Sequence, residues 1–240
     1  MLCIDNHSPS WIKRPLVQYD QSFIRSEDQT FKTASADGTA IKGEIGICDT
    51  LRFEGVTFTD VPFYVIPENA KENTSDDGVF GIELLKKGIL KIDFGKSELT
   101  FASAPDSIEN IYDAEIFPAT FTNEKIAVDV SFGNKVLKKM AVDLGFNGDF
   151  LLPAGEFKDI SEHKKTFIQT KQFTTPASFN IVNSTSVFDT VKIDHSWFIA
   201  LISSSHTVTE RLIGLQFFKR FDYVIFDFIN RRIYLPKKIW

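Results

Sequence analysis

Asp143 is a carboxylic acid in an apolar stretch of the chain. Ala141 and Val142 precede it, Leu144 follows it, and Gly145 comes next. An ionised carboxylate is costly to bury among apolar side chains, so an acid in this setting is either compensated or placed there for its chemistry. A carboxylate can act as a general acid or as a general base. Asp143 is therefore the first candidate functional residue.

Three segments of the first half of the chain recur in the second half, in the same order. The segment DTLRFEG, which begins at Asp49, resembles DTVKIDH, which begins 140 positions later. The segment GVFGIELLKK, with Gly81 at its centre, has a counterpart 133 positions later, and IDFGKSELTF, which contains Asp93, has one 134 positions later. Three ordered matches at nearly one offset predict two similar lobes in tandem.

A similar offset, counted back from Asp143, leads to Asp5 near the start of the sequence. Asp5 lies 138 positions before Asp143 and follows the apolar residues 2–4. Small and polar residues follow it, as far as Trp11. Asp5 is therefore the candidate partner acid, one from each predicted lobe.

The pattern of short β-branched and aromatic runs between turn residues predicts an all-β fold. Hairpin turns are expected at Asp37-Gly38, Glu54-Gly55 and Gly133-Asn134. The expected lobes are residues 1–104 and 123–240, joined by a connection at 105–122. The first lobe has only four residues before its acid, so we expect it to lack its first hairpin. Strands are expected at 31–34, 41–47, 50–53, 56–58, 61–66, 126–132, 136–142, 166–172, 179–182, 188–193 and 197–202, and short helices at 83–87, 161–166 and 215–220.

Together these features resemble the pepsin and retropepsin superfamily of aspartic proteases, most closely its bacterial two-lobed members. The most specific part is a paired apolar-apolar-glycine motif, Val79-Phe80-Gly81 and Leu212-Ile213-Gly214, each before a predicted short helix. The resemblance implies a bilobal fold in which each glycine strand runs beside a catalytic turn, where a side chain would collide with that turn. It implies that Asp5 and Asp143 flank a lytic water and cleave an extended peptide, without a cofactor or metal. It places the flap at Asp37, Gly38 and Thr39.

The turns depart from the family pattern. Asn6 and Leu144 stand where a Thr or Ser usually follows each acid, and Leu144 has no hydroxyl with which to brace the pair. His7 occupies the glycine position of the first turn, whereas Gly145 keeps it in the second. At the third position after each acid, Ser8 keeps a hydroxyl but the second turn has a Phe.

These departures leave alternatives open. A degenerate module that binds or inhibits through its cleft is the main rival to an active protease. A third possibility is a structural domain whose missing hairpin comes from a second chain. Replacement of Asp143 by Asn separates the first two, because only the protease loses a cleavage activity.

Composition and charge argue against several other classes of function. The net charge is −5, and no long tract of Lys or Arg suggests nucleic-acid binding. Two cysteines are too few for a disulfide framework, and the four histidines lack the spacing of a metal site. No run of about 20 apolar residues predicts a membrane span, and neither localisation nor oligomeric state can be read from the chain. Four acids recur in two pairs, Asp49 with Asp189 and Asp93 with Asp227, and all four are interpreted as turn residues.

Overall fold

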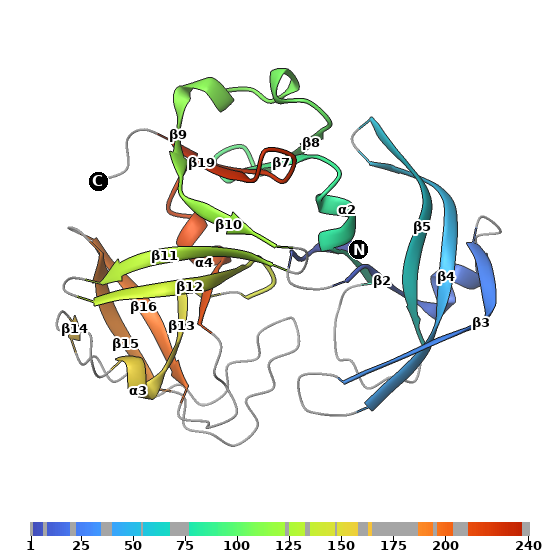
Figure 1. Cartoon of the computed structure of the whole chain (residues 1–240), viewed down its shortest axis with the longest axis horizontal. Helices are drawn as coiled ribbons and strands as arrows, with labels where there is room; N and C mark the ends of the chain where they lie inside the picture. Colours follow the sequence, from blue (N-terminus) through green and yellow to red (C-terminus); the bar gives the residue numbers. More distant parts are fainter. Residues whose placement is uncertain are drawn as a thin grey trace.

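The protein is built mainly of β-strands, which form three sheets (Figure 1). The computed structural model describes residues 2–6, 9–19, 23–34, 40–53, 55–67, 77–122, 125–132, 135–146, 148–157, 163–164, 187–193, 196–203 and 211–236. The predicted all-β class is confirmed. The strands predicted at 166–172 and 179–182 lie outside the described residues.

The first sheet has six strands in the order β1-β6-β2-β5-β4-β3. Its short inner strand β6 pairs in parallel with β1 and antiparallel with β2, and β2 pairs in parallel with β5. The long strands β5, β4 and β3 form an antiparallel arm at the right of Figure 1. The bounds are β1 (Leu2–Ile4), β2 (Trp11–Lys13), β3 (Phe23–Ala34), β4 (Ala40–Phe53), β5 (Val56–Ile66) and β6 (Gly78–Phe80).

The second sheet repeats this arrangement of strand directions and adds two strands at one side. Its order is β10-β11-β12-β17-β13-β16-β15-β14, and its short inner strand β17 is parallel to β12 and antiparallel to β13. Strand β13 in turn pairs in parallel with β16. The bounds are β10 (Ala119–Phe121), β11 (Ile126–Phe132), β12 (Lys135–Asp143), β13 (Phe150–Pro153), β14 (His163–Lys164), β15 (Val187–Ile193), β16 (Ser196–Ser203) and β17 (Leu212–Gly214).

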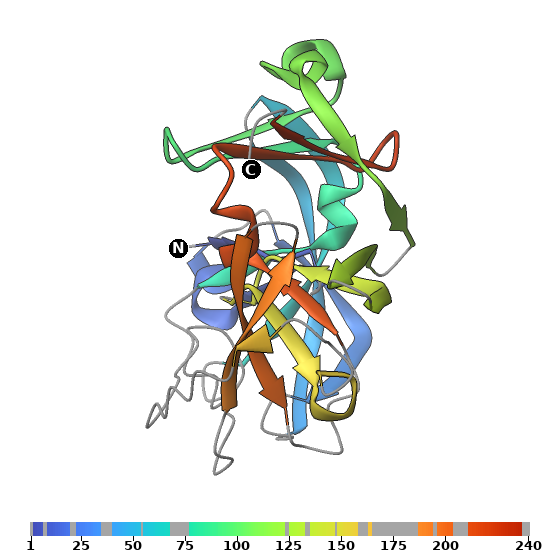
Figure 2. The same cartoon turned by 90° about the vertical axis from the view of Figure 1, so that its left-hand side faces the viewer.

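The third sheet joins the two halves of the chain. Its order is β8-β7-β18-β19-β9, and the central pair β7 and β18 comes from the corresponding parts of the two halves, with Asp93 opposite Tyr223. Figure 2 shows this sheet above the second sheet. The bounds are β7 (Ile89–Asp93), β8 (Glu98–Ala102), β9 (Ala114–Phe117), β18 (Tyr223–Asp227) and β19 (Arg232–Pro236), with the 3-10 turns η1 (Pro105–Ser107) and η2 (Ile111–Asp113) between β8 and β9.

Asp93 and Asp227 have the hairpin role that the sequence predicts. The backbone N–H of Lys96 donates to Asp93 Oδ1 at 2.9 Å, and that of Asn230 donates to Asp227 Oδ1 at 2.8 Å. In each case the carboxylate closes the turn that follows its strand. The same interpretation is wrong for Asp49 and Asp189, which lie inside β4 and β15: Asp189 pairs with Ala200, and the residues on both sides of Asp49 pair with β5.

The described part of the chain has four short α-helices beside the sheets: α1 (Arg14–Tyr19), α2 (Ile82–Leu85), α3 (Ala154–Phe157) and α4 (Leu215–Phe218). Helices α2 and α4 were predicted, whereas α1 and α3 were not. The helix predicted at 161–166 is wrong at its centre, because His163 and Lys164 form β14 against Thr190 and Val191 of β15. Pairing with a neighbouring strand here outweighs the helical preference of a polar run. None of the helices among the described residues has the length and apolar character needed to cross a membrane.

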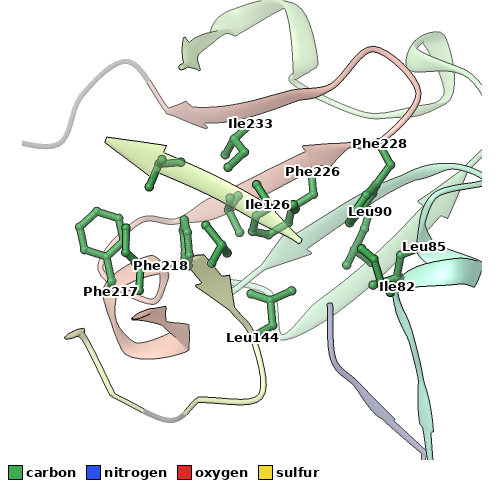
Figure 3. Close-up of a cluster of buried hydrophobic side chains, with 14 of the residues drawn as sticks. Ile82, Leu85, Leu90, Ile126, Leu144, Phe217, Phe218, Phe226, Phe228 and Ile233 are labelled. Atoms are coloured by element: carbon green, nitrogen blue, oxygen red, sulfur yellow. The ribbon is translucent and has the colours of Figure 1, made fainter. Parts of the chain in front are cut away.

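The core lies where the three sheets meet, and Phe side chains fill much of it. Phe218 packs on Phe226 with ring centroids 5.4 Å apart, and Phe58 packs on Phe101 at 5.8 Å. Figure 3 shows part of this cluster, which includes Ile126 from β11 and Leu144 from the turn after β12. The core therefore extends to the turn that carries Asp143.

Candidate functional site

Asp5 and Asp143 occupy matching places in the first two sheets. Asp5 follows β1 directly, and its N–H donates to the carbonyl of Phe80 at 3.3 Å. Asp143 is the last residue of β12 and pairs with Gly214 of β17. Each acid thus lies at the end of a strand that runs parallel to one of the two apolar-apolar-glycine strands.

The two carboxylates converge on Gly145. A Cβ atom placed on Gly145 would lie 2.8 Å from Asp5 Oδ2 and 3.2 Å from Asp143 Oδ1. These two oxygens are therefore no farther apart than the sum of those distances. Any side chain at Gly145 would enter the space that the acids share, so glycine leaves this space to the two carboxylates. The structure brings together the two acids and the glycine that the sequence predicts as one site.

Two backbone N–H groups point at one oxygen of Asp143. Gly145 donates to Asp143 Oδ1 at 2.9 Å and Phe146 donates to the same atom at 3.0 Å. The Asp143 residue is 5 % exposed. Hydrogen bonds donated to a carboxylate stabilise its charged form and offset the cost of burial. The backbone N–H of Phe146 thus supports the Asp143 carboxylate, although the Phe146 side chain has no hydroxyl that could do so.

The Asn6 amide bonds to both chain neighbours of Asp143. Its Nδ2 donates to the carbonyl of Val142 at 2.8 Å, and its Oδ1 accepts from the N–H of Leu144 at 2.8 Å. Asn6 is fully buried. The turn after Asp5 is therefore fastened to the strand end that carries Asp143.

Leu144 and Phe146 take apolar roles in this turn. Leu144, at the start of the turn, is buried in the main core cluster, part of which Figure 3 shows. Phe146 is buried in a smaller cluster with Ala141, Leu151 and Leu212. Both side chains anchor the turn by packing, in place of the hydroxyl bonds that the resemblance implies.

Gly214 lies against the turn that follows Asp143. A Cβ atom on Gly214 would lie 2.2 Å from the carbonyl oxygen of Gly148 and 2.4 Å from that of Phe146. The Gly214 N–H donates to the carbonyl of Asp149 at 2.9 Å. The backbone of this turn thus occupies the space of a side chain at 214, and the turn is bonded to β17.

Gly81 is held by a residue that the sequence did not single out. Its N–H donates to the hydroxyl oxygen of Ser10 at 2.8 Å, and the N–H of Ser10 donates to a carboxylate oxygen of Glu83. Ser10 is fully buried. Its position five residues after Asp5, in a run of small and polar residues, is the signal that could have identified it.

Asp149 and Arg220 form a second feature that the sequence did not indicate. The Asp149 side chain is 4 % exposed and pairs with the Arg220 guanidinium, Oδ2 to Nη2, at 2.8 Å. Asp149 closes the turn that starts at Asp143, so the ion pair fastens this turn to the residues just after α4. The two residues are 71 positions apart, and sequence reasoning has no local signal for such a pair.

Several predicted site residues lie outside the described residues. These are His7 and Ser8 of the first turn, and Asp37, Gly38 and Thr39 of the predicted flap. Strands β3 and β4 pair up to the residues that border 35–39, with Ala34 opposite Ala40. Among the described residues, no cluster of His, Cys, Asp and Glu side chains could hold a metal ion.

Comparison with known proteins gives no assignment. No protein-family model matches the chain, and no curated protein matches it significantly. The case for a function therefore rests on the geometry of the site.

Proposed function

We propose that this chain is an aspartic-type endopeptidase with a bilobal, pepsin-like fold, in which Asp5 and Asp143 form the catalytic pair. The observation that carries the proposal is the convergence of both carboxylates on Gly145 from two similarly connected sheets. In this proposal the lobes are residues 1–104 and 123–240, and residues 105–122 connect them.

Two carboxylates this close favour a state with one shared negative charge. Ionising the second acid beside the first is unfavourable, so one stays protonated over a range of pH. The ionised acid takes a proton from a water molecule, and the protonated acid donates a hydrogen bond to the carbonyl oxygen of the peptide bond. The N–H groups of Gly145 and Phe146 stabilise a negative charge on Asp143.

The proposed substrate is a peptide in extended conformation. An extended chain presents its backbone N–H and C=O groups for strand-like hydrogen bonds with a β protein. The proposed reaction consumes water and releases a carboxylate and an amine, and it requires no metal or cofactor.

Cleavage of a mixed peptide library from about pH 3 to about pH 8 tests the proposal, because this range covers the titration of paired carboxylates. The chain is compared with Asp5→Asn and Asp143→Asn, which keep the shape of each side chain but cannot ionise. Asp222→Asn is the matched control, because Asp222 is exposed and lies outside the proposed pair. We expect cleavage at acidic pH by the parent and the control, and none by the other two variants. Equal cleavage by Asp143→Asn would rule out the proposed pair.

A non-catalytic peptide-binding module is the second candidate. It is favoured by Leu144 and Phe146, two buried apolar side chains in the turn where the resemblance implies hydroxyls. It predicts that peptides bind but are not cleaved at any pH, and that Asp143→Asn leaves binding unchanged. Peptide binding is measured on the same library, by retention on the immobilised protein.

A further inference from the structure

The chain between β8 and β9 crosses the third sheet. These two strands are the edges of that sheet, so residues 103–113, the crossing segment, travel from one edge to the other. On the way they pass the pair β7 and β18, where the first and second halves of the chain meet. Figures 1 and 2 both show this segment above the sheet. The crossing segment therefore spans the seam between the two halves, which is the β7–β18 pair.

The crossing segment covers the outer face of the sheet. Leu90 and Phe226 belong to the main core cluster, whereas the residues before them, Ile89 and Ile225, belong to a separate buried cluster. Successive side chains of a strand point to opposite faces, so this outer cluster lies on the face turned away from the main core. Its other buried members are Ala102, Tyr234 and two residues of the crossing segment, Ile108 and Ile111. Apolar packing therefore joins the crossing segment to strands from both halves.

Lys91 lies on this outer face and is almost completely buried. It is two residues after Ile89 in β7, and its side chain is 4 % exposed. Its Nζ lies 3.4 Å from Asp93 Oδ2 and 3.8 Å from Glu109 Oε2. The same atom lies over the ring of Tyr223 in β18, 4.9 Å from the ring centre. A buried ammonium group requires such compensation, and Glu109 of the crossing segment supplies part of it.

Polar contacts tie the crossing segment to each side of the seam. Glu109, whose side chain is 66 % exposed, accepts a hydrogen bond from Lys96 Nζ at 3.0 Å, in the turn after β7. The carbonyl of the next residue, Asn110, accepts from the Tyr223 hydroxyl at 3.4 Å. Glu109 is thus bonded to the first half of the chain, and Asn110 to the second.

We propose that residues 108–111 form a strap across the seam, with Glu109 as its ionic latch, and that local opening of this strap exposes Lys91. The inference goes beyond the proposed function and does not depend on catalysis by Asp5 and Asp143. The outer cluster holds the strap on the sheet. Exposed ion pairs are weak individually, so the latch changes how often the strap opens and does not prevent opening. The strap thereby controls how firmly the two halves are joined on this face.

The latch is charged at neutral and mildly alkaline pH. The hydrogen bond from Lys96, together with the positive charges of Lys96 and Lys91, holds the pKa of Glu109 below its ordinary value. Burial and the charge of Asp93 oppose this shift but are outweighed. Salt is therefore the means of weakening the latch in the folded protein. The Debye length falls from about 10 Å at 0.1 M salt to about 3 Å at 1 M, so exposed charges attract one another less.

Acetylation of Lys91 measures the opening of the strap. Because the side chain is almost completely buried, an amine-reactive acetylating reagent reaches its Nζ when the strap opens. Labelling is carried out on the full chain at pH 8 and is quantified by mass spectrometry after digestion. Lys138, whose side chain is 70 % exposed, is labelled in the same sample and reports the activity of the reagent.

Glu109→Gln removes the charge of the latch and keeps the size of the side chain. Glu115→Gln is the matched control, because it removes the same charge from an exposed position in β9. In Glu109→Gln we expect Lys91 to be labelled about fivefold faster than in the parent, the size expected for the loss of exposed ion pairs. Salt at 1 M is expected to speed labelling of the parent by a similar factor and to change Glu109→Gln little. The control is expected to behave like the parent.

Hydrogen exchange separates opening of the strap from a change in the reactivity of Lys91. Loss of a neighbouring carboxylate lowers the pKa of an ammonium group, which by itself makes the amine more reactive. Exchange of the backbone N–H groups of residues 105–113 does not depend on that effect, and one of these groups, that of Ile108, donates to the carbonyl of Pro105 at 2.9 Å. We expect exchange in 105–113 to be faster in Glu109→Gln and in the parent at high salt, and exchange in β11 to be unchanged.

Two outcomes would overturn the strap. One is faster labelling of Lys91 without faster exchange in residues 105–113, and the other is labelling and exchange that neither Glu109→Gln nor salt changes. If Glu109→Gln does not fold, the salt series on the parent decides between the same outcomes.

Discussion

Arg220 donates to both carboxylate oxygens of Asp149, through Nε to Oδ1 at 3.3 Å and through Nη2 to Oδ2 at 2.8 Å. The Asp149 side chain is almost completely buried, whereas the Arg220 side chain is 40 % exposed. The Arg220 guanidinium therefore compensates the buried charge of Asp149, which closes the turn that starts at Asp143. The guanidinium itself stays partly in contact with water. This ion pair gives a test of what holds the turn in place.

Replacement of Arg220 by Leu is expected to lower the free energy of unfolding by about 2 kcal/mol, because it leaves a buried carboxylate without its cation. The figure lies below that of a fully buried pair since water can reach the site that Arg220 leaves. Urea unfolding measures the change. Lys138→Leu is the control, because Lys138 pairs with Asp129 at an exposed position and is expected to matter by less than about 1 kcal/mol. Equal losses in the two variants would contradict the structural role given to Arg220.

A methyl group at Gly214 is expected to destabilise the protein by about 3 kcal/mol, because two carbonyl oxygens of the turn occupy its place. Backbone atoms cannot move aside as a flexible side chain can. Gly155→Ala is the matched control, since, apart from its chain neighbours and its own helix backbone, no atom of the described residues lies within 4 Å of a Cβ at that position in α3. Its effect is expected to stay below about 1 kcal/mol. Thermal or urea unfolding of both variants provides the comparison, and a Gly214→Ala protein as stable as the control would show that the turn can move.

A methyl group at Gly145 is expected to affect the proposed reaction more than the stability. The nearest atom to a Cβ there is the Asp5 Oδ2 atom, at the end of a side chain that can rotate away. Such a displacement costs little folding energy but misplaces a proposed catalytic group, so we expect cleavage to slow by about 100-fold. The measurement is kcat/KM for a peptide that the parent cleaves, together with the unfolding temperature. A variant with normal cleavage would show that the two acids do not act across this space.

The Asp93 carboxyl predicts a loss of stability in acid. Burial raises its pKa, but the Lys96 backbone N–H and the Lys91 ammonium group outweigh burial and hold the pKa below its ordinary value, which is about 4. A carboxyl whose pKa is lower in the folded state stabilises the fold above its unfolded pKa, and this contribution is lost as the pH falls through the folded pKa. The parent should therefore be more stable than Asp93→Asn at pH 7, and the difference should shrink below about pH 4.

Urea unfolding of both proteins at a series of pH values measures this difference. Asp113→Asn, an exposed acid in η2, is the control for a general effect of removing one negative charge. A difference between the parent and Asp93→Asn that stays constant from neutral to acidic pH would contradict the assignment.

The sequence by itself determined the all-β class, because alternation and β-branched composition are local properties of each strand. The hairpin roles of Asp93 and Asp227 were predictable for the same reason, since each carboxylate bonds to an N–H three residues later. The internal repeat also led to Asp5, whose carboxylate lies near that of Asp143 at Gly145. The repeat identifies equivalent positions, and Asp5 and Asp143 lie at the ends of the equivalent strands β1 and β12.

Only the tertiary structure decided what surrounds the two acids. The bonds of Asn6 to Val142 and Leu144 join positions 136 and 138 residues apart, and the bond of Ser10 to Gly81 spans 71. The pairing of His163 and Lys164 with β15 likewise depends on a strand that lies elsewhere in the chain. A local pattern shows which side chains can form hydrogen bonds or pack. Which partner each one finds depends on how the sheets come together, because burial and pairing are properties of the folded chain.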